Sequence, residues 1–371
     1  MRKNLLASES GSLYLFVLCG ISILSNIFYY VMGSVGGSFA GVPVSTWVNY
    51  AVTQAAILLV VWGFSMWRRY DLPAVAKLRP MKDARRYLLL LPIAIFSIIA
   101  FLPVSMLFQA FFNAIGYVGG ISAGQISYDN VGVFFLSVFV LGLLPAVCEE
   151  LFMRGNVLSG LASRGALFGV FISALLFALL HNNPLQTGYQ FCLGVVLAVL
   201  FLSSRSIVPC VAVHFLNNFF SLLITAYIPE IDGAIANLGA FNWLTGTLSF
   251  VVGTLALVLL LYAYHRLGSP KEDNGGYKVV GGGVVFDEYT IRAYSDDGGT
   301  SKPDRLAPVK DAFRYVGSLF TAKGWQRTER ELFLSSDLQY VGKRQPMFGV
   351  WLAVGLAAAY WLIALIMGLT L

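Results

Sequence analysis

The sequence predicts an all-α polytopic membrane protein with about nine transmembrane helices and a small α+β cytosolic insert before the last helix. The 371 residues are 57% hydrophobic and 12% charged, with a mean hydropathy of +0.73, which is too apolar for a water-soluble domain. The apolar residues also fall in runs of about 20, the length that a helix needs to cross the hydrocarbon core of a bilayer.

Nine apolar runs have this length or come close to it. The predicted spans are 12–34, 46–67, 87–114, 131–153, 165–182, 185–204, 207–227, 242–264 and 347–369. Lys and Arg crowd the loop 68–86 between the second and third spans, which places that loop in the cytosol by the positive-inside rule. Nine alternating spans then put the N-terminus and the segment 267–346 in the cytosol and the C-terminus outside.

The net charge of +6 does not indicate nucleic-acid binding, because the basic residues outside the segment 267–346 lie at the ends of spans. The predicted partner is therefore the lipid bilayer and not a nucleic acid, and no oligomeric state is predicted.

The four cysteines lie within apolar runs and show no disulfide framework. We expect a bacterial plasma membrane as the location, because the chain carries no eukaryotic targeting signal.

The segment 267–346 differs from the rest of the chain, since it holds 12 of the 25 Lys and Arg and 11 of the 19 Asp and Glu. Alternation and β-branched content predict strands in 281–295 and 331–344, and a helix is predicted over 308–323. The chain is therefore divided into N-terminal spans (1–129), a core (130–227), an eighth span (228–266), a cytosolic insert (267–346) and a last span (347–371).

The stretch LLPAVCEELFMRG, residues 143–155, places Glu149 and Glu150 in an apolar run, and no other acid lies in one. An ionised carboxylate inside a membrane helix costs about 2.5–3.5 kcal/mol on insertion scales, so such residues tend to face a bundle interior and to be functional. Helical spacing allows Glu150 and Arg154 to pair, whereas Glu149 points about 100° away. We assign Glu150 and Arg154 to orientation and charge compensation, and Glu149 to acid–base work. A structural ion pair at the membrane interface is the alternative.

Two of the three histidines lie in or at the ends of spans, His181 in FALLHNN and His214 in AVHFLNNFF. His214 and Asn218 are one helical turn apart and can both present N–H donors, as an oxyanion hole requires. Asn217 fits nearly as well by spacing alone. In this interpretation Glu149 and His181 share a water and activate it for attack on a peptide carbonyl.

No His-Glu-x-x-His sequence is present, so we predict neither a tightly bound metal nor another cofactor. Zinc held by the two histidines and two glutamates is the minority alternative.

These residues form three motifs, EELFMR at 149–154, FALLH at 177–181 and HFLNN at 214–218. They resemble the Glu-Glu-x-x-x-Arg, Phe-x-x-x-His and His-x-x-x-Asn motifs of the CAAX protease and bacteriocin-processing family. The resemblance covers about residues 130–226 and brings Phe177 into the set as a supporting residue.

The resemblance implies an intramembrane glutamate endopeptidase that cleaves a peptide or the terminus of a membrane protein. It assigns water activation to Glu149 and His181, and the oxyanion hole to His214 and Asn218, which favours Asn218 over Asn217. Two other functions compete with this prediction. The same polar cluster would serve a non-enzymatic scaffold or a bacteriocin self-immunity protein, and buried Glu and His also build proton relays in transporters. The transporter is disfavoured because no inverted repeat of spans is found.

If all spans cross the membrane at full length in alternation, the residues of this site do not meet. Such spans place Glu149 near the inner end of its span and His181 near the far end of the next. We therefore expect the helices around Pro145 and Pro184 to be short, broken or tilted, or 165–204 to form a hairpin whose apex stays inside the membrane, beside a cavity that opens to the cytosol.

Overall fold

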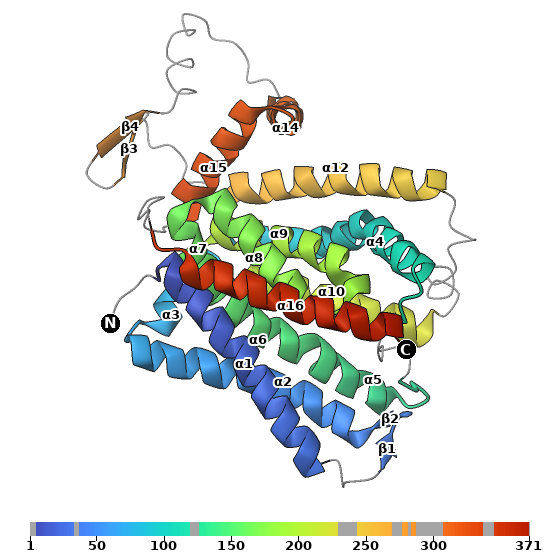
Figure 1. Ribbon diagram of the computed structural model, residues 1–371. Helices are drawn as coiled ribbons and strands as arrows, with labels where there is room; N and C mark the ends of the chain where they lie inside the picture. Colours follow the sequence, from blue (N-terminus) through green and yellow to red (C-terminus); the bar gives the residue numbers. More distant parts are fainter. Residues whose placement is uncertain are drawn as a thin grey trace, which may run out of the picture.

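The computed structural model describes residues 5–32, 37–118, 126–228, 243–268, 277–280, 283–286, 307–336 and 345–370. Over these residues the chain is a bundle of helices (Figure 1), and eight helical stretches are long and apolar enough to cross a membrane. The predicted class, a polytopic all-α membrane protein, is therefore confirmed. The eight are α1 (Ala7–Met32), α2 (Val44–Arg68), the 3-10 turn Ala84–Leu89 with α4 (Leu90–Ala114), the stretch Val131–Arg164, the 3-10 turn Pro184–Gln186 with α9 (Thr187–Ser204), α10 (Val208–Tyr227), α12 (Trp243–Gly268) and α16 (Phe348–Thr370).

The remaining predicted span, 165–182, is helical but short. It is α8 (Ala166–Leu180), whose 15 residues extend over only about 22 Å, against about 30 Å for the hydrocarbon core. α8 and α9 pack against each other as a hairpin so closely that a Cβ added to Gly194 would lie 2.9 Å from the Cα of Ala174. Small residues at such contacts are typical of packed membrane helices.

The fourth span is longer than predicted, because the run 131–153 continues as helix to Arg164. It consists of α5 (Val131–Ser137), α6 (Leu144–Phe152), α7 (Ser159–Leu161) and a closing 3-10 turn (Ala162–Arg164), with π-helical segments at Val138–Leu143 and Met153–Leu158. The two π segments lie on either side of α6. Each widens the helical ladder locally, an irregularity that occurs frequently at functional sites.

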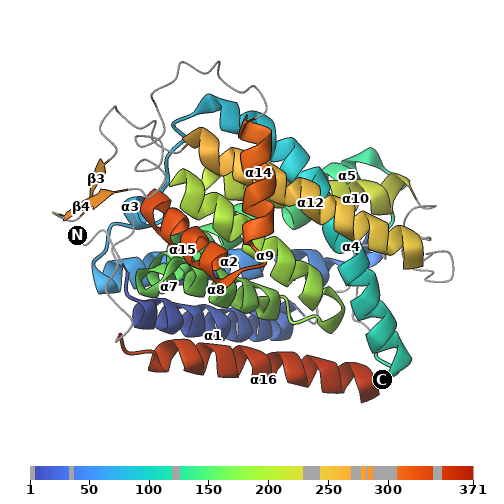
Figure 2. The ribbon, with the colours of Figure 1, turned by 90° about the horizontal axis from the view of Figure 1, so that it is seen from above.

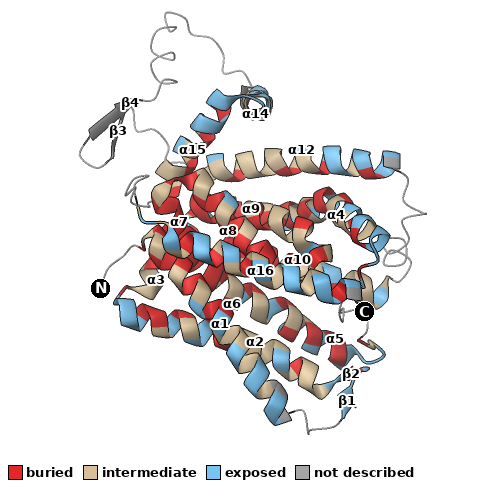
Figure 3. Cartoon of the chain, in the orientation of Figure 1, coloured by how far each residue is buried: buried red, intermediate tan, exposed pale blue. Residues whose placement is uncertain are grey.

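Outer helices surround a central group formed by α6, α8, α9 and α10. α1 packs against α2 and α16, and α4 packs against α12, on opposite sides of the centre (Figures 1 and 2). Buried residues concentrate in the central group (Figure 3). The outer faces expose large apolar side chains, among them Trp62 on α2, Leu248 on α12 and Ile366 on α16, and this surface suits contact with lipid.

Short elements complete the described residues. Two antiparallel hairpins are present, β1 (Ser38–Phe39) with β2 (Val42–Pro43) and β3 (Tyr277–Val280) with β4 (Gly283–Phe286). Their registers pair Ser38 with Pro43 and Tyr277 with Phe286. The helical turn α3 (Leu72–Val75) lies in the basic loop after α2. β4 falls within the predicted strand region 281–295, and residues 287–295 lie outside the described part of the chain.

The second strand predicted for the insert is wrong over 331–336, because these residues belong to α15 (Ala322–Ser336). The predicted helix 308–323 is divided between α14 (Ala307–Ser318) and the start of α15. Buried residues of α15 recur every fourth position, at Gly324, Thr328, Leu332 and Ser336, and form one face of a helix that packs on α9 and α8. Over six residues this pattern resembles alternation, which explains the error. Residues 337–344 lie outside the described ranges.

Charge-assisted hydrogen bonds at the middle and at the C-terminal end of α15 attach it to the bundle. The Glu329 carboxylate accepts hydrogen bonds from the backbone N–H of Ala166, at 2.7 Å, and of Leu167, so it caps the N-terminus of α8. At the C-terminal end, the Arg205 guanidinium donates to the carbonyls of Leu334 and Ser335 in the last turn of α15. The insert therefore contributes directly to the central group of helices.

Candidate active site

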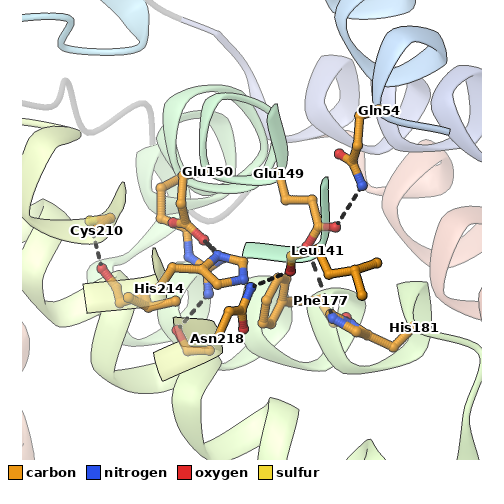
Figure 4. A network of polar contacts seen from close by, with 12 residues as sticks. Gln54, Leu141, Glu149, Glu150, Phe177, His181, Cys210, His214 and Asn218 are labelled. Atoms are coloured by element: carbon orange, nitrogen blue, oxygen red, sulfur yellow. Dashed lines mark hydrogen bonds and ion pairs between the residues drawn. The ribbon is translucent and has the colours of Figure 1, made fainter. Parts of the chain in front are cut away.

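Both adjacent glutamates lie on α6, and an irregular backbone next to them binds a neighbouring helix. Pro145 has no N–H and cannot bond the carbonyl of Leu141, its partner in a regular α-helix. The side-chain Nδ2 of Asn218 on α10 donates to that carbonyl at 3.3 Å (Figure 4). The proline therefore frees an acceptor that connects α10 to the helix with the carboxylates.

Glu150 is fully buried at the centre of a charged cluster. Its Oε1 accepts from Arg154 Nη1 at 2.7 Å and from His214 Nδ1 at 2.9 Å. The exposed fraction of the side chain is 0% for Glu150 and 1% for Arg154. Arg154 Nη2 also donates to the carbonyl of Gly194 on α9, at 3.2 Å. The predicted Glu150–Arg154 pair is therefore confirmed, and His214 is a third member of the cluster.

Phe177 on α8 separates the polar side chains and contacts three of them. The Arg154 guanidinium carbon lies 4.3 Å from the centre of the Phe177 ring, a cation–π arrangement. The imidazoles of His181 and His214 meet the same ring edge to face, with centroids at 4.8 Å and 5.6 Å. The supporting residue of the second motif is thus a buried apolar wall against which both histidines pack.

Glu149 faces away from the Glu150 cluster, toward His181. Its Oε2 lies 4.0 Å from His181 Nε2, and its Oε1 accepts a hydrogen bond from Gln54 Nε2 at 3.2 Å (Figure 4). His181 Nδ1 lies 2.9 Å from the carbonyl of Phe177, and because a carbonyl only accepts, Nδ1 carries a proton. In a neutral imidazole Nε2 is then an acceptor. Two acceptors, a carboxylate oxygen and a ring nitrogen, therefore face each other.

The two deviations in helix length bring Glu149 and His181 to the same depth. Glu149 lies fifteen residues before the end of its helical stretch at Arg164, and His181 lies fifteen residues after the start of α8 at Ala166. Both side chains are therefore about 22 Å along the helix axis from the neighbouring ends. The expectation that the helices near Pro145 and Pro184 depart from ideal full spans agrees with this geometry.

The asparagines that spacing left open have different environments. Asn217 is buried, and its Oδ1 accepts a hydrogen bond from the Tyr189 hydroxyl on α9. Asn218 contacts the Leu141 carbonyl and so faces the helix of the two glutamates. Asn183 caps the 3-10 turn after α8 by accepting from the N–H of Leu185, and Asn182 has a left-handed backbone with φ of 48°.

Sequence reasoning missed Gln54 on α2, the hydrogen-bond donor to Glu149. Gln54 is a long polar residue in a mainly apolar span and is only 6% exposed. An amide in such a run is a weak signal, because an uncharged side chain needs no ionic partner and its direction depends on which helices meet. The Glu150–His214 contact was missed for the same reason, since it joins residues that lie far apart in the sequence.

Metal-ligating side chains are divided between two separate pairs. Glu149 lies with His181 and Glu150 with His214. Within the described residues no group of three or more His, Cys, Asp or Glu side chains is gathered in a way that could hold a metal ion. The predictions about a metal, either none or zinc as the minority alternative, stay predictions that a chelation experiment tests.

A helical bundle with eight spanning helices and paired Glu and His side chains at its centre defines a multi-pass membrane protein with a polar site between its helices. Residues 131–220 match the family model described as type II CAAX prenyl endopeptidase Rce1-like, within the CAAX protease and bacteriocin-processing family. The resemblance found in the three motifs is therefore confirmed, and the matched segment contains all three of them. At the level of the family, the match supports a CAAX-protease-like enzyme. No curated protein and no solved structure matches the chain.

Proposed function

We propose that this protein is an intramembrane endopeptidase that hydrolyses a peptide bond in a peptide or near the terminus of a membrane protein. The facing acceptors, Glu149 Oε2 and His181 Nε2 at 4.0 Å, carry the proposal. Two acceptors cannot bond each other, but a water molecule has two O–H donors and can bond both. The family match over residues 131–220 supports peptide-bond hydrolysis at the level of the family.

In the proposed reaction the water oxygen attacks the carbonyl carbon of the scissile peptide bond while Glu149 takes a proton from the water. His181 holds the second water hydrogen and so fixes the direction of attack. The tetrahedral intermediate collapses when the C–N bond breaks and the proton moves to the leaving nitrogen. The products are a carboxylic acid and an amine, which become a carboxylate and an ammonium group when the acid proton moves to the amine, and no residue of the protein forms a covalent intermediate.

Negative charge develops on the carbonyl oxygen during the attack. We assign its stabilisation to N–H donors on α10. Asn218 uses one N–H for the Leu141 carbonyl, and a primary amide has a second. His214 binds Glu150 through Nδ1, so Nε2 is its second ring nitrogen and donates when it is protonated. Arg154 and Phe177 keep Glu150 and the two imidazoles in place.

Cleavage of a defined peptide tests the proposal. The full-length protein, purified in detergent, is incubated with a synthetic farnesylated peptide that ends in a CAAX sequence, and the products are identified by mass spectrometry. Glu149→Gln and His181→Gln should each lower kcat by about 10² to 10⁴. Glu331→Gln is the matched control, because Glu331 pairs with Arg327 on α15 away from the site. Full cleavage by the Glu149→Gln protein would overturn the mechanism.

A scaffold or immunity protein is the second candidate function, and the buried Glu150–Arg154–His214 cluster favours it because such a cluster also holds helices together without chemistry. In a scaffold, Glu149→Gln changes partner binding or the melting temperature and there is no cleavage to lose. A melting curve measured beside the cleavage assay separates the two functions.

We also propose the orientation that the positive-inside rule predicts, with the N-terminus and the insert 267–346 in the cytosol of a bacterium. Accessibility of single cysteines at the two ends of the chain to a membrane-impermeant maleimide tests it. Labelling of an N-terminal cysteine in intact cells would reverse the assignment.

A further inference from the structure

Gln54 reaches the site from a helix that the family match does not include. It lies on α2 (Val44–Arg68), whereas the match covers residues 131–220, and α2 packs against α6. Its Nε2 donates to Glu149 Oε1 at 3.2 Å (Figure 4). Of the two oxygens of Glu149, Gln54 therefore holds one and leaves the other directed at His181.

The orientation of the Gln54 amide follows from its partner. An ionised carboxylate only accepts hydrogen bonds, so the amide nitrogen points at Glu149 and the amide oxygen points elsewhere. That oxygen is buried and has no hydrogen-bond partner among the described residues. Buried amide oxygens are nearly always paired, because leaving one unpaired costs free energy. An unpaired acceptor next to the candidate catalytic carboxylate is a position for a donor from a ligand.

We propose that Gln54 positions Glu149 and that its Oε1 accepts a backbone N–H of the peptide substrate, beside the scissile bond. This inference rests on the proposed endopeptidase function. An extended peptide carries alternating N–H donors and C=O acceptors, and the structure offers partners for both. The second amide N–H of Asn218 and a protonated Nε2 of His214 are the donors proposed on α10, and the unpaired Oε1 of Gln54 is the acceptor on α2. A substrate seated in this way lies across the Glu149–His181 pair.

The two roles of Gln54 predict separate kinetic effects. Loss of the Nε2 donor frees the Glu149 carboxylate to rotate, which lowers kcat because Oε2 no longer stays directed at His181. Loss of the Oε1 acceptor weakens substrate binding, which raises KM. A residue that only fills space between α2 and α6 would change neither parameter once the protein is folded.

The experiment uses the full-length protein in detergent and a synthetic farnesylated CAAX peptide. Gln54→Met keeps the length and volume of the side chain and removes both polar atoms. We expect kcat to fall about 10-fold or more and KM to rise about 3- to 10-fold, the fold-change of one hydrogen bond. Thr53→Val is the matched control, because it removes a hydroxyl group from the adjacent position, which donates to the Asn49 carbonyl of its own helix and has no other hydrogen bond among the described residues. It should behave as wild type.

A set of peptides with single backbone esters identifies the substrate contact. Each peptide replaces one N–H next to the scissile bond by oxygen and keeps the scissile amide intact. One of these esters should raise KM about 3- to 10-fold with the wild-type protein and should have no effect with Gln54→Met. This measurement with the wild-type protein remains informative if the variant does not fold.

The possible outcomes distinguish the two proposed roles of Gln54 from the proposed endopeptidase function. Wild-type kinetics in Gln54→Met would overturn the whole inference, and an ester effect of equal size in both proteins would overturn the substrate contact. Neither result touches the proposed function, which fails if the wild-type protein does not cleave the peptide, or its mechanism, which fails if Glu149→Gln cleaves the same peptide fully.

Discussion

Replacement of Arg154 by methionine tests whether the ion pair between Arg154 and Glu150 stabilises the buried cluster. The substitution keeps an unbranched apolar stem and removes the guanidinium, which is 2.7 Å from Glu150 Oε1 and 3.2 Å from the Gly194 carbonyl. Glu150 would then be a fully buried carboxylate with His214 as its one ionisable partner among the described residues. Removal of one member of a buried pair typically costs about 3–5 kcal/mol, because the other charge is left uncompensated.

Two further contacts of Arg154 contribute to this loss. The cation–π contact with Phe177 is worth about 2 kcal/mol in a desolvated site, and an orphaned carbonyl costs about 1–3 kcal/mol. These contributions overlap and are not additive, so we expect a total loss of about 3–5 kcal/mol in the free energy of unfolding. The assay is unfolding by sodium dodecyl sulfate in mixed micelles, followed by tryptophan fluorescence. Arg164→Met is the matched control at the end of the same helical stretch, where the arginine is half-buried and stacks on Phe168.

A double-mutant cycle completes this test. The double variant Glu150→Gln with Arg154→Met removes both charges, so it should be more stable than the sum of the single effects predicts, by about 1–3 kcal/mol. Single effects that add to within about 0.5 kcal/mol, or an Arg154→Met protein as stable as the Arg164→Met control, would refute the buried pair as the stabilising element.

Three other predictions use the same purified protein. Asn218→Ala should lower kcat about 10²- to 10³-fold with little change in KM, whereas Asn217→Ala should act through stability because Asn217 bonds Tyr189, and equal kinetic losses in both would contradict the choice of Asn218. Glu329→Gln should lower the free energy of unfolding by about 1 kcal/mol because it weakens the cap of α8, while Glu331→Gln should not, and melting curves measure both. Dialysis against EDTA should leave peptide cleavage unchanged, and a loss that zinc restores would favour the zinc alternative.

Local spacing explains why much of the site was predictable. Glu150 and Arg154 are one helical turn apart, so the period of the helix predicts their pairing, and the bond of 2.7 Å confirms it. The positions of the spans follow equally from local composition, because about 20 apolar residues suffice to cross a bilayer whatever the neighbouring helices do. The strand expected at 331–336 failed because a short alternating pattern also fits one face of α15, and packing against α9 decided between them.

The sequence by itself determined the class of the protein, the places of its helices and the residues of the three motifs, since each depends on neighbours along the chain. Only the tertiary structure decided that Glu149 and His181 meet, because the meeting depends on two helix lengths, a long stretch to Arg164 and a short α8. It also decided the contacts of Gln54 with Glu149 and of His214 with Glu150. Contacts between helices depend on how the helices tilt and pack, and no spacing within one helix encodes that arrangement.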